Sequence, residues 1–247
     1  MAISELQRRF LELANERQIF PLLNKKQTEF YQQHRKWDPD GPHGRRAAVL
    51  VLLCNVDGAP SLLFTRRAAH LSQHAAEISF PGGHVEASET YQEAALREAC
   101  EELLPPPGLL EDRVQMIGRT TKLPSIRGTP VTPVIAVLPT EIQGNEIDKL
   151  FPGNPNEVDV VFSATVADLA QKEGTHVIPN NRFGMAKAPT FDTPHGKIWG
   201  LTAFILRPLL HKVLKPVYLQ RGANAAAEGE EESLPTNSDD RIQPASS

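Results

Sequence analysis

Three glutamates within one turn of a predicted helix are the strongest sign of chemistry in this sequence. Glu98, Glu101 and Glu102 are spaced so that 98 and 102 stack one above the other, with 101 beside them. Neighbouring carboxylates repel each other, and a hard divalent cation would remove that repulsion. Because the donors are oxygen atoms, with no histidine or cysteine in reach, the sequence favours Mg²⁺ or Mn²⁺ over Zn²⁺.

A glycine loop and an arginine accompany these carboxylates. Gly82 and Gly83 permit a close approach of the backbone to a ligand. Arg97 lies four residues before Glu101 and eight after Glu89, so we expect it to hold an acidic partner in place. Cations that neutralise phosphate oxygens, together with a carboxylate that deprotonates water, would hydrolyse a diphosphate. The alternative interpretation is a solvated acidic helix after an ordinary turn.

The helix that carries the glutamates has clear limits in the sequence. Thr90 and Glu93 form a capping box, which predicts a helix start at about Tyr91. Three prolines at residues 105–107 forbid its continuation, so we expect a helix over residues 91–104. Its buried side is predicted from a repeat of four: Tyr91, Ala95, Ala99 and Leu103.

The remaining pattern mixes strands and helices without strict alternation, which predicts an α/β or α+β fold. The apolar run Ala47–Cys54 is typical of a strand buried on both faces, and Ser61–Thr65 follows a turn. Further strands are expected at 114–118, 131–138, 159–162 and 197–200, and a helix at 202–214 with a kink or break at Pro208. We expect Trp199 in the core, with stacking on a ligand ring as the alternative.

Three regions follow from changes in composition. Residues 1–36 are predicted to form a helical extension, because Ile3, Leu6, Phe10 and Leu13 make an apolar stripe. Residues 37–221 are expected to form the main domain. Residues 222–247 hold six acidic residues, one basic residue and almost nothing large and apolar, which indicates a disordered acidic tail.

The overall composition excludes several classes of protein. The 247 residues include 26 basic and 30 acidic ones, and a net charge of -4 disfavours a nucleic-acid binder. No apolar run is long enough to span a membrane. Two cysteines, Cys54 and Cys100, provide neither a disulfide framework nor a zinc site. We therefore expect a soluble intracellular protein, cytoplasmic by default because no clear targeting signal is seen, with mitochondrial or peroxisomal location and a homodimer left open.

The segment from residue 83 to residue 105 resembles the Nudix box, G-x5-E-x7-R-E-U-x-E-E-x-G-U, where U is a bulky aliphatic residue. The positions that match are Gly83, Glu89, Arg97, Glu98, Glu101 and Glu102. Ala99 is smaller than usual, and Leu104 with Pro105 replaces glycine and an aliphatic residue. The prolines are expected to stop the helix in place of that glycine. The resemblance implies a Nudix fold, with a mixed β-sheet sandwiched between helices.

The same resemblance implies roles for individual residues. Glu98, Glu101 and Glu102 correspond to the metal-binding carboxylates, one of which can serve as general base. The Gly83 carbonyl is a further candidate metal ligand. Some Nudix enzymes place the base on a later loop, and Glu157 is our candidate there, with a solvated carboxylate at a strand end as the alternative.

Residues 63–83 (LFTRRAAHLSQHAAEISFPGG) resemble the signature of the coenzyme A pyrophosphatase branch, LLTxR[SA]x3Rx3Gx3FPGG, with departures at Phe64, Ser72 and Ala76. Arg66 and Arg67, together with Gly82 and Gly83, are the candidates for binding the nucleotide's phosphates. The alternative for this segment is a polar connector between two strands.

The implied reaction is hydrolysis of the diphosphate bond of coenzyme A or acyl-coenzyme A, giving 3′,5′-ADP and 4′-phosphopantetheine species. Hydrolysis of ADP-ribose, an NAD-type dinucleotide or a sugar nucleotide is the nearest alternative. A Nudix binding module without catalysis is the alternative of a different class.

Overall fold

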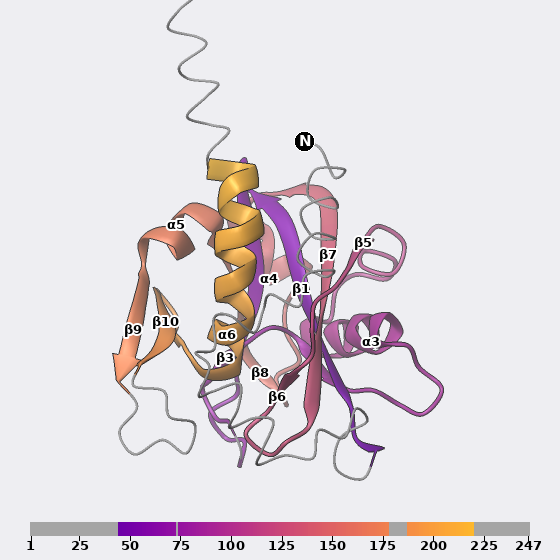
Figure 1. Ribbon diagram of the computed structural model, residues 1–247. Helices are drawn as coiled ribbons and strands as arrows, with labels where there is room; N and C mark the ends of the chain where they lie inside the picture. Colours follow the sequence, from indigo (N-terminus) through magenta and orange to yellow (C-terminus); the bar gives the residue numbers. More distant parts are fainter. Residues whose placement is uncertain (1–43, 73, 178–186, 220–247) are drawn as a thin grey trace, which may run out of the picture.

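A mixed β-sheet of eight strands forms the centre of the described part of the chain, which comprises residues 44–72, 74–177 and 187–219 of the computed structural model. The elements in chain order are β1 (Ala47–Val56), β2 (Ala59–Arg67), β3 (Ile78–Ser79), β4 (Gly82–His84), α3 (Tyr91–Leu103), β5 (Gln115–Arg119), β6 (Leu123–Pro124), β7 (Pro130–Ile142), the 3₁₀ turn η3 (Gly144–Glu146), α4 (Ile147–Leu150), β8 (Val158–Thr165), α5 (Val166–Gln171), β9 (Glu173–Val177), β10 (Lys187–Thr193), β11 (Gly196–Ile198), α6 (Gly200–Leu209) and the π-helix η4 (Leu210–Leu219). Five strands follow the order β3-β2-β1-β7-β5, while β4 pairs with β1, β6 with β7 and β8 with β2. Figure 1 shows the long strands β1 and β7 side by side. Only β1 and β7 run parallel among the strand pairs of the described sheet. The expected α+β class is confirmed.

Strand β1 is buried on both faces, as its apolar sequence predicts. Val51 and Leu53 belong to one hydrophobic core, whereas Leu50 and Leu52 belong to the other. Successive side chains of a strand point to opposite faces, so this alternation fills two cores from one strand. The prediction for Ala47–Cys54 is confirmed, and the strand continues two residues further, to Val56.

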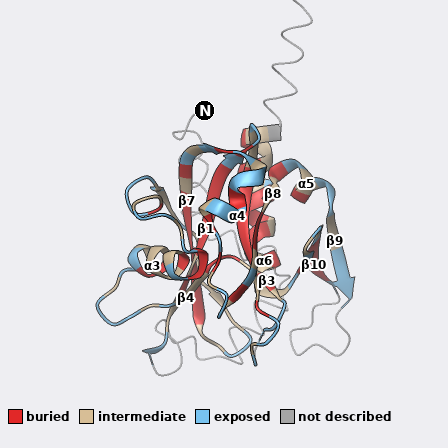
Figure 2. Ribbon diagram, turned by 180° about the vertical axis from the view of Figure 1, so that it is seen from behind, coloured by how far each residue is buried: buried red, intermediate tan, exposed pale blue. Residues whose placement is uncertain are grey.

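Helices cover each of these faces. Ala95 and Leu103 of α3 and Ile147 of α4 pack in one core, while Leu169 of α5 and Leu206 of α6 pack in the other. Figures 1 and 2, seen from opposite sides, show α6 in front of the sheet in one view and α3 with α4 in front in the other. The expected sandwich of a mixed sheet between helices is confirmed.

A second sheet, of three strands in the order β11-β10-β9, was largely missed by the sequence analysis. One of its strands was expected at 197–200 and lies at Gly196–Ile198. The prediction of a core position for Trp199 is wrong, because its side chain is 48% exposed. Ile198 is fully buried, and the alternation of the strand therefore turns the next side chain outward.

Pro208 does not end the last helix. α6 begins at Gly200, includes Pro208 and continues directly into the π-helix η4. Proline has no N–H for the normal helical bond. The Leu210 N–H still donates to the carbonyls of Leu206 and Arg207, and the π-helix runs from this residue to Leu219. Of the expected kink or break, the break is wrong, because the helical segment continues with a change of helix type.

The other predicted elements are confirmed with shifted limits. Strands expected at 114–118, 131–138 and 159–162 lie at Gln115–Arg119, Pro130–Ile142 and Val158–Thr165. The predicted extension 1–36 and acidic tail 222–247 lie outside the described residues. Within the described part of the chain, no helix is long and apolar enough to cross a membrane.

Candidate active site

The N-terminal end of α3 is fixed by the predicted capping box. The Glu93 N–H donates to the Thr90 hydroxyl at 3.2 Å, and the Thr90 N–H donates to the Glu93 carboxylate at 2.8 Å. Two N–H groups that the helix itself cannot satisfy are thereby bonded. The helix therefore starts at Tyr91, as predicted, and this start sets which face each glutamate presents.

The C-terminal end of α3 uses a left-handed residue where the Nudix box has glycine. Leu104 has φ 50° and ψ 51°, and its N–H donates to the Cys100 carbonyl. Prolines alone were expected to stop the helix, but the turn is made by Leu104 before the first of them. A residue with a Cβ atom is strained by about 1 to 2 kcal/mol in this conformation, whereas glycine is not.

Replacing Leu104 with glycine should raise the free energy of unfolding by about 0.5 to 1 kcal/mol, because the strain that glycine relieves exceeds the additional entropy that it loses on folding. The side chain is 45% exposed, so only part of its surface is withdrawn from water. Urea denaturation of Leu104→Gly and Leu104→Ala measures the effect. Alanine keeps the strain, so equal stabilisation by both variants would contradict the explanation.

The last carbonyls of α3 are bonded by a loop that is distant in sequence. The Gly153 N–H donates to the Leu103 carbonyl at 3.1 Å, and the Asn154 N–H donates to the Glu102 carbonyl at 2.8 Å. The Glu157 N–H then donates to the Asn154 carbonyl at 2.9 Å. This loop brings Glu157 close enough to Glu102 for its charge to raise the pKa of that carboxyl. No local sequence signal indicates these bonds.

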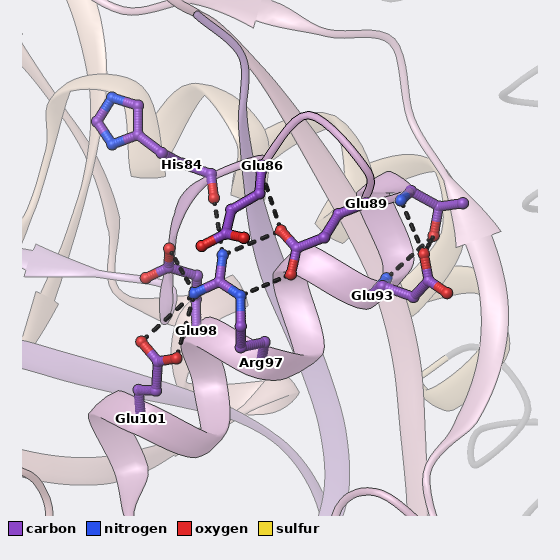
Figure 3. A network of polar contacts seen from close by, with 8 residues as sticks. His84, Glu86, Glu89, Glu93, Arg97, Glu98 and Glu101 are labelled. Carbon is purple, nitrogen blue, oxygen red and sulfur yellow. Dashed lines mark hydrogen bonds and ion pairs between the residues drawn. The ribbon is translucent and has the colours of Figure 1, made fainter.

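Arg97 lies at the centre of a polar network on the exposed side of α3 (Figure 3). Its guanidinium donates to both oxygens of Glu89, at 2.6 and 3.1 Å, and to the His84 carbonyl at 3.0 Å. It also donates to Glu98 at 3.1 Å and to Glu101 at 3.3 Å. The hydrogen bond from Arg97 lowers the pKa of Glu89. The arginine thus fixes the loop before α3 against the helix that carries the glutamates.

The Glu98 carboxylate packs directly on the backbone of Gly83. A Cβ atom at position 83 would lie 2.3 Å from Glu98 Oε2, so glycine is required for this approach. Burial raises the pKa of Glu98, and the charge of Arg97 opposes that rise. The structure therefore brings together the glycine loop and the first of the three glutamates.

Glu102 is the most buried of the three glutamates, at 3% exposure. Arg67 Nη1 lies 3.8 Å from Glu102 Oε1, whereas Glu102 Oε2 and Arg67 Nε are buried without a hydrogen-bond partner. Burial raises the pKa of Glu102 to about 8, while Arg67 and the Gly82 amide oppose the rise. At neutral pH this carboxyl accordingly favours its protonated form in the absence of a cation.

The raised pKa of Glu102 makes the stability of the metal-free protein depend on pH. The ordinary pKa of 4.5 applies to the unfolded chain and about 8 to the folded one. The folded state therefore binds more protons between these values, and the free energy of unfolding falls as pH rises from about 5 to about 8, by up to about 1.4 kcal/mol per pH unit. Urea titrations with a chelator at pH 5.5 and 7.5 should show a smaller fall for Glu102→Gln than for wild type. Equal slopes would contradict the assignment.

The two predicted phosphate-binding arginines point to opposite faces of β2. Arg67 reaches Glu102, as described above. Arg66 instead donates to Asp159 at 2.9 Å and to the His195 carbonyl at 3.1 Å. The pairing of β2 with β8 also has an irregularity between these two residues, and their side chains have different partners. The structure therefore brings Arg67, and not Arg66, to the glutamates.

Comparison with known proteins identifies the family. The NUDIX domain model matches residues 44–183, which is more than half of the chain. The chain belongs to the Nudix family. Its sequence is 32% identical over 184 residues to a protein of Enterobacter sp. (strain 638) named "Uncharacterized Nudix hydrolase NudL", a match that covers 73% of this chain and 90% of that relative. A protein of the same name from Salmonella newport (strain SL254) is 34% identical over 175 residues, covering 70% and 85%.

Solved Nudix structures also resemble this chain. The Nudix hydrolase RenU from M. Smegmatis has a TM-score of 0.39 and 23% sequence identity, and the match covers 51% of this chain and 73% of that one. Nudix hydrolases generally need divalent metal ions and act on small substrates derived from nucleotides.

The donors in this candidate site fit such an ion. Among the described residues, no group of three or more acidic, histidine or cysteine side chains is already arranged to coordinate a metal ion. Glu101 is 55% exposed in its side chain, and Arg97 engages both Glu98 and Glu101. The unpartnered Oε2 of Glu102 and the neighbouring carboxylates nevertheless offer only oxygen, the donor that hard divalent cations prefer.

Proposed function

We propose that this Nudix protein hydrolyses the diphosphate bond of coenzyme A or acyl-coenzyme A, with Mg²⁺ or Mn²⁺, to 3′,5′-ADP and 4′-phosphopantetheine species. The observation that carries the proposal is the contact of Arg67 with Glu102. Arg67 belongs to the segment that resembles the coenzyme A pyrophosphatase signature, whereas Glu102 belongs to the Nudix box. The contact therefore places a residue of the proposed substrate-binding segment beside a residue of the proposed metal-binding motif.

The turn at Ala76 also supports the assignment to the coenzyme A pyrophosphatase branch. Ala76 stands where the signature has glycine, and its φ of 58° lies in the region that favours glycine. The Ala76 N–H donates to the Arg67 carbonyl at 3.2 Å, so this turn holds the backbone of Arg67. The backbone shape that the signature glycine favours is thus present despite the substitution.

Glu98, Glu101, Glu102 and the Gly83 carbonyl are the groups that would hold the divalent cation. When bound there, the cation neutralises phosphate oxygens and lowers the pKa of water. Arg67, with its unpartnered Nε, donates to a diphosphate oxygen. Glu157, which comes from a separate loop beside the cluster, is our candidate to take the proton from the attacking water.

The bond changes of this hydrolysis are simple. A new bond forms between the water oxygen and one phosphorus atom. The bond between that phosphorus and the bridging oxygen breaks, and the bridging oxygen leaves on the other phosphate. Arg97 contributes by positioning, since it holds Glu98 and Glu101 and ties them to Glu89.

The test is product analysis by mass spectrometry in ¹⁸O-water with Mg²⁺ or Mn²⁺. Coenzyme A and acetyl-coenzyme A should give 3′,5′-ADP and a 4′-phosphopantetheine species, one of which carries the label. Parallel reactions with ADP-ribose, an NAD-type dinucleotide and a sugar nucleotide compare the alternative substrates. Faster hydrolysis of one of these alternatives, or intact coenzyme A after long incubation, would contradict the proposed substrate.

A further inference from the structure

Two arginines from different parts of the sheet meet at one aromatic ring. The guanidinium carbon of Arg46 lies 5.5 Å from the centre of the Tyr91 ring, and that of Arg119 lies 5.3 Å from it. Arg46 directly precedes β1, whereas Arg119 is the last residue of β5. Both distances are within the range of a cation–π interaction. Two guanidinium groups therefore lie beside the same ring.

These two charges lack an acidic partner within the described ranges 44–72, 74–177 and 187–219. No ion pair of this part of the chain includes Arg46 or Arg119. Of the acidic groups nearest in sequence to Tyr91, Glu89 pairs with Arg97, and Glu93 accepts hydrogen bonds from Thr90 at the start of the helix. Two positive charges beside one ring favour a bound anion, which would lower the repulsion between them.

The arginine pair lies next to the candidate active site. The Arg46 carbonyl accepts the Val85 N–H at 2.9 Å, and the next residue of β1, Ala47, pairs with His84 of the glycine-loop strand β4. Tyr91 begins the helix on which Glu98 lies seven residues later. At 1.5 Å per residue, this separation is about 10 Å along the helix. A group bound at the arginines would therefore be a short distance from a diphosphate at the glutamates.

We propose that Arg46 and Arg119 bind a phosphate monoester carried on the ribose of the substrate nucleotide. This inference rests on the proposed function, and it adds the residues that distinguish a 3′-phosphorylated nucleotide from an unphosphorylated one. A guanidinium presents parallel N–H donors that match phosphate oxygens. The ribose separates its 3′-phosphate from the 5′-diphosphate, as the helix separates Tyr91 from Glu98. Tyr91 acts as a positioning residue, because its ring holds both guanidinium groups.

The test compares coenzyme A with 3′-dephospho-coenzyme A in wild type, Arg46→Gln and Arg119→Gln. Each variant should raise KM for coenzyme A by about 10-fold or more, since a charge-assisted hydrogen bond is lost. KM for 3′-dephospho-coenzyme A should change by less than about 2-fold, because that substrate lacks the phosphate in question. Equal changes for both substrates would overturn the inference.

Two further variants test whether a change in KM results from a disturbed structure and not from lost phosphate binding. Arg113→Gln removes an exposed arginine that lies just before β5, at the strand end opposite Arg119, and both substrates should be hydrolysed as by wild type. Arg119→Lys keeps the charge and loses the planar fork, so its KM for coenzyme A should fall between those of wild type and Arg119→Gln. If Arg119→Lys raised KM as much as Arg119→Gln does, and for both substrates, the result would count against phosphate binding.

Calorimetry separates this inference from the proposed function. If wild type hydrolyses neither substrate, the proposed function is wrong, and binding of 3′,5′-ADP and 5′-AMP then decides the role of the arginines. Weaker binding of 3′,5′-ADP alone in Arg119→Gln supports the phosphate site. Equal affinity of wild type and Arg119→Gln for 3′,5′-ADP overturns it.

Discussion

Glu102→Gln should lower kcat by about 10³-fold or more while the protein remains folded. Glutamine keeps the shape of the side chain but removes its negative charge. In the folded protein Glu102 is 3% exposed, and its Oε2 has no hydrogen-bond partner. A buried oxygen of this kind is suited to a cation, and glutamine cannot supply the same charge. Steady-state kinetics with Mg²⁺ or Mn²⁺ measures the effect.

The matched control for this prediction is Glu146→Gln. Glu146 is an exposed glutamate of η3, so its substitution should leave kcat unchanged. Circular dichroism and urea denaturation show whether each variant is folded. A folded Glu102→Gln protein with the turnover of wild type would exclude the proposed role of this carboxylate.

Substitution of the two neighbouring glycines by alanine should give opposite kinds of defect. In Gly82→Ala, the new Cβ would lie 2.3 Å from the Ala48 carbonyl oxygen and 2.6 Å from the Val49 Cα, at a backbone φ of 153°. Backbone atoms of a central strand cannot move aside easily. We expect this variant to lose about 3 kcal/mol or more of stability, or to fail to fold.

In Gly83→Ala, the clash is with a side chain. The new Cβ would meet the Glu98 carboxylate, which is the far end of a flexible side chain and can rotate away. The fold should therefore survive, while kcat falls by about 10²-fold because Glu98 is displaced. Denaturation and kinetics on both variants test the contrast. An inactive but unfolded Gly83→Ala protein, or a stable Gly82→Ala protein, would contradict it.

The parts of the fold that local sequence determines were predicted well. Helix α3 starts where its capping box places it, because the bonds between Thr90 and Glu93 span three residues. Strand β1 has an unbroken apolar run, and both of its faces are buried. The short strands β3, β4 and β6 were missed, since two or three residues carry too little pattern to distinguish them from turns.

The site was predicted less completely, for reasons of geometry. The motif places Glu98, Glu101 and Glu102 on one helix but does not indicate how different their burial is. The sequence analysis left open whether the segment with the two arginines is a polar connector. It therefore did not indicate which of Arg66 and Arg67 lies beside the glutamates. The bonds that hold residues 153 and 154 to α3 are contacts distant in sequence, and no spacing rule predicts them.

Those bonds also bear on the order in which the chain folds. The Asn154 N–H reaches the Glu102 carbonyl across about fifty residues of intervening chain. A nascent chain that ends before residue 153 lacks both donors for the end of α3, and it also lacks Glu157. Completion of the carboxylate cluster therefore requires residues 153–157, which are synthesised after the whole motif. A truncated protein of that length would thus contain the whole motif without an assembled site.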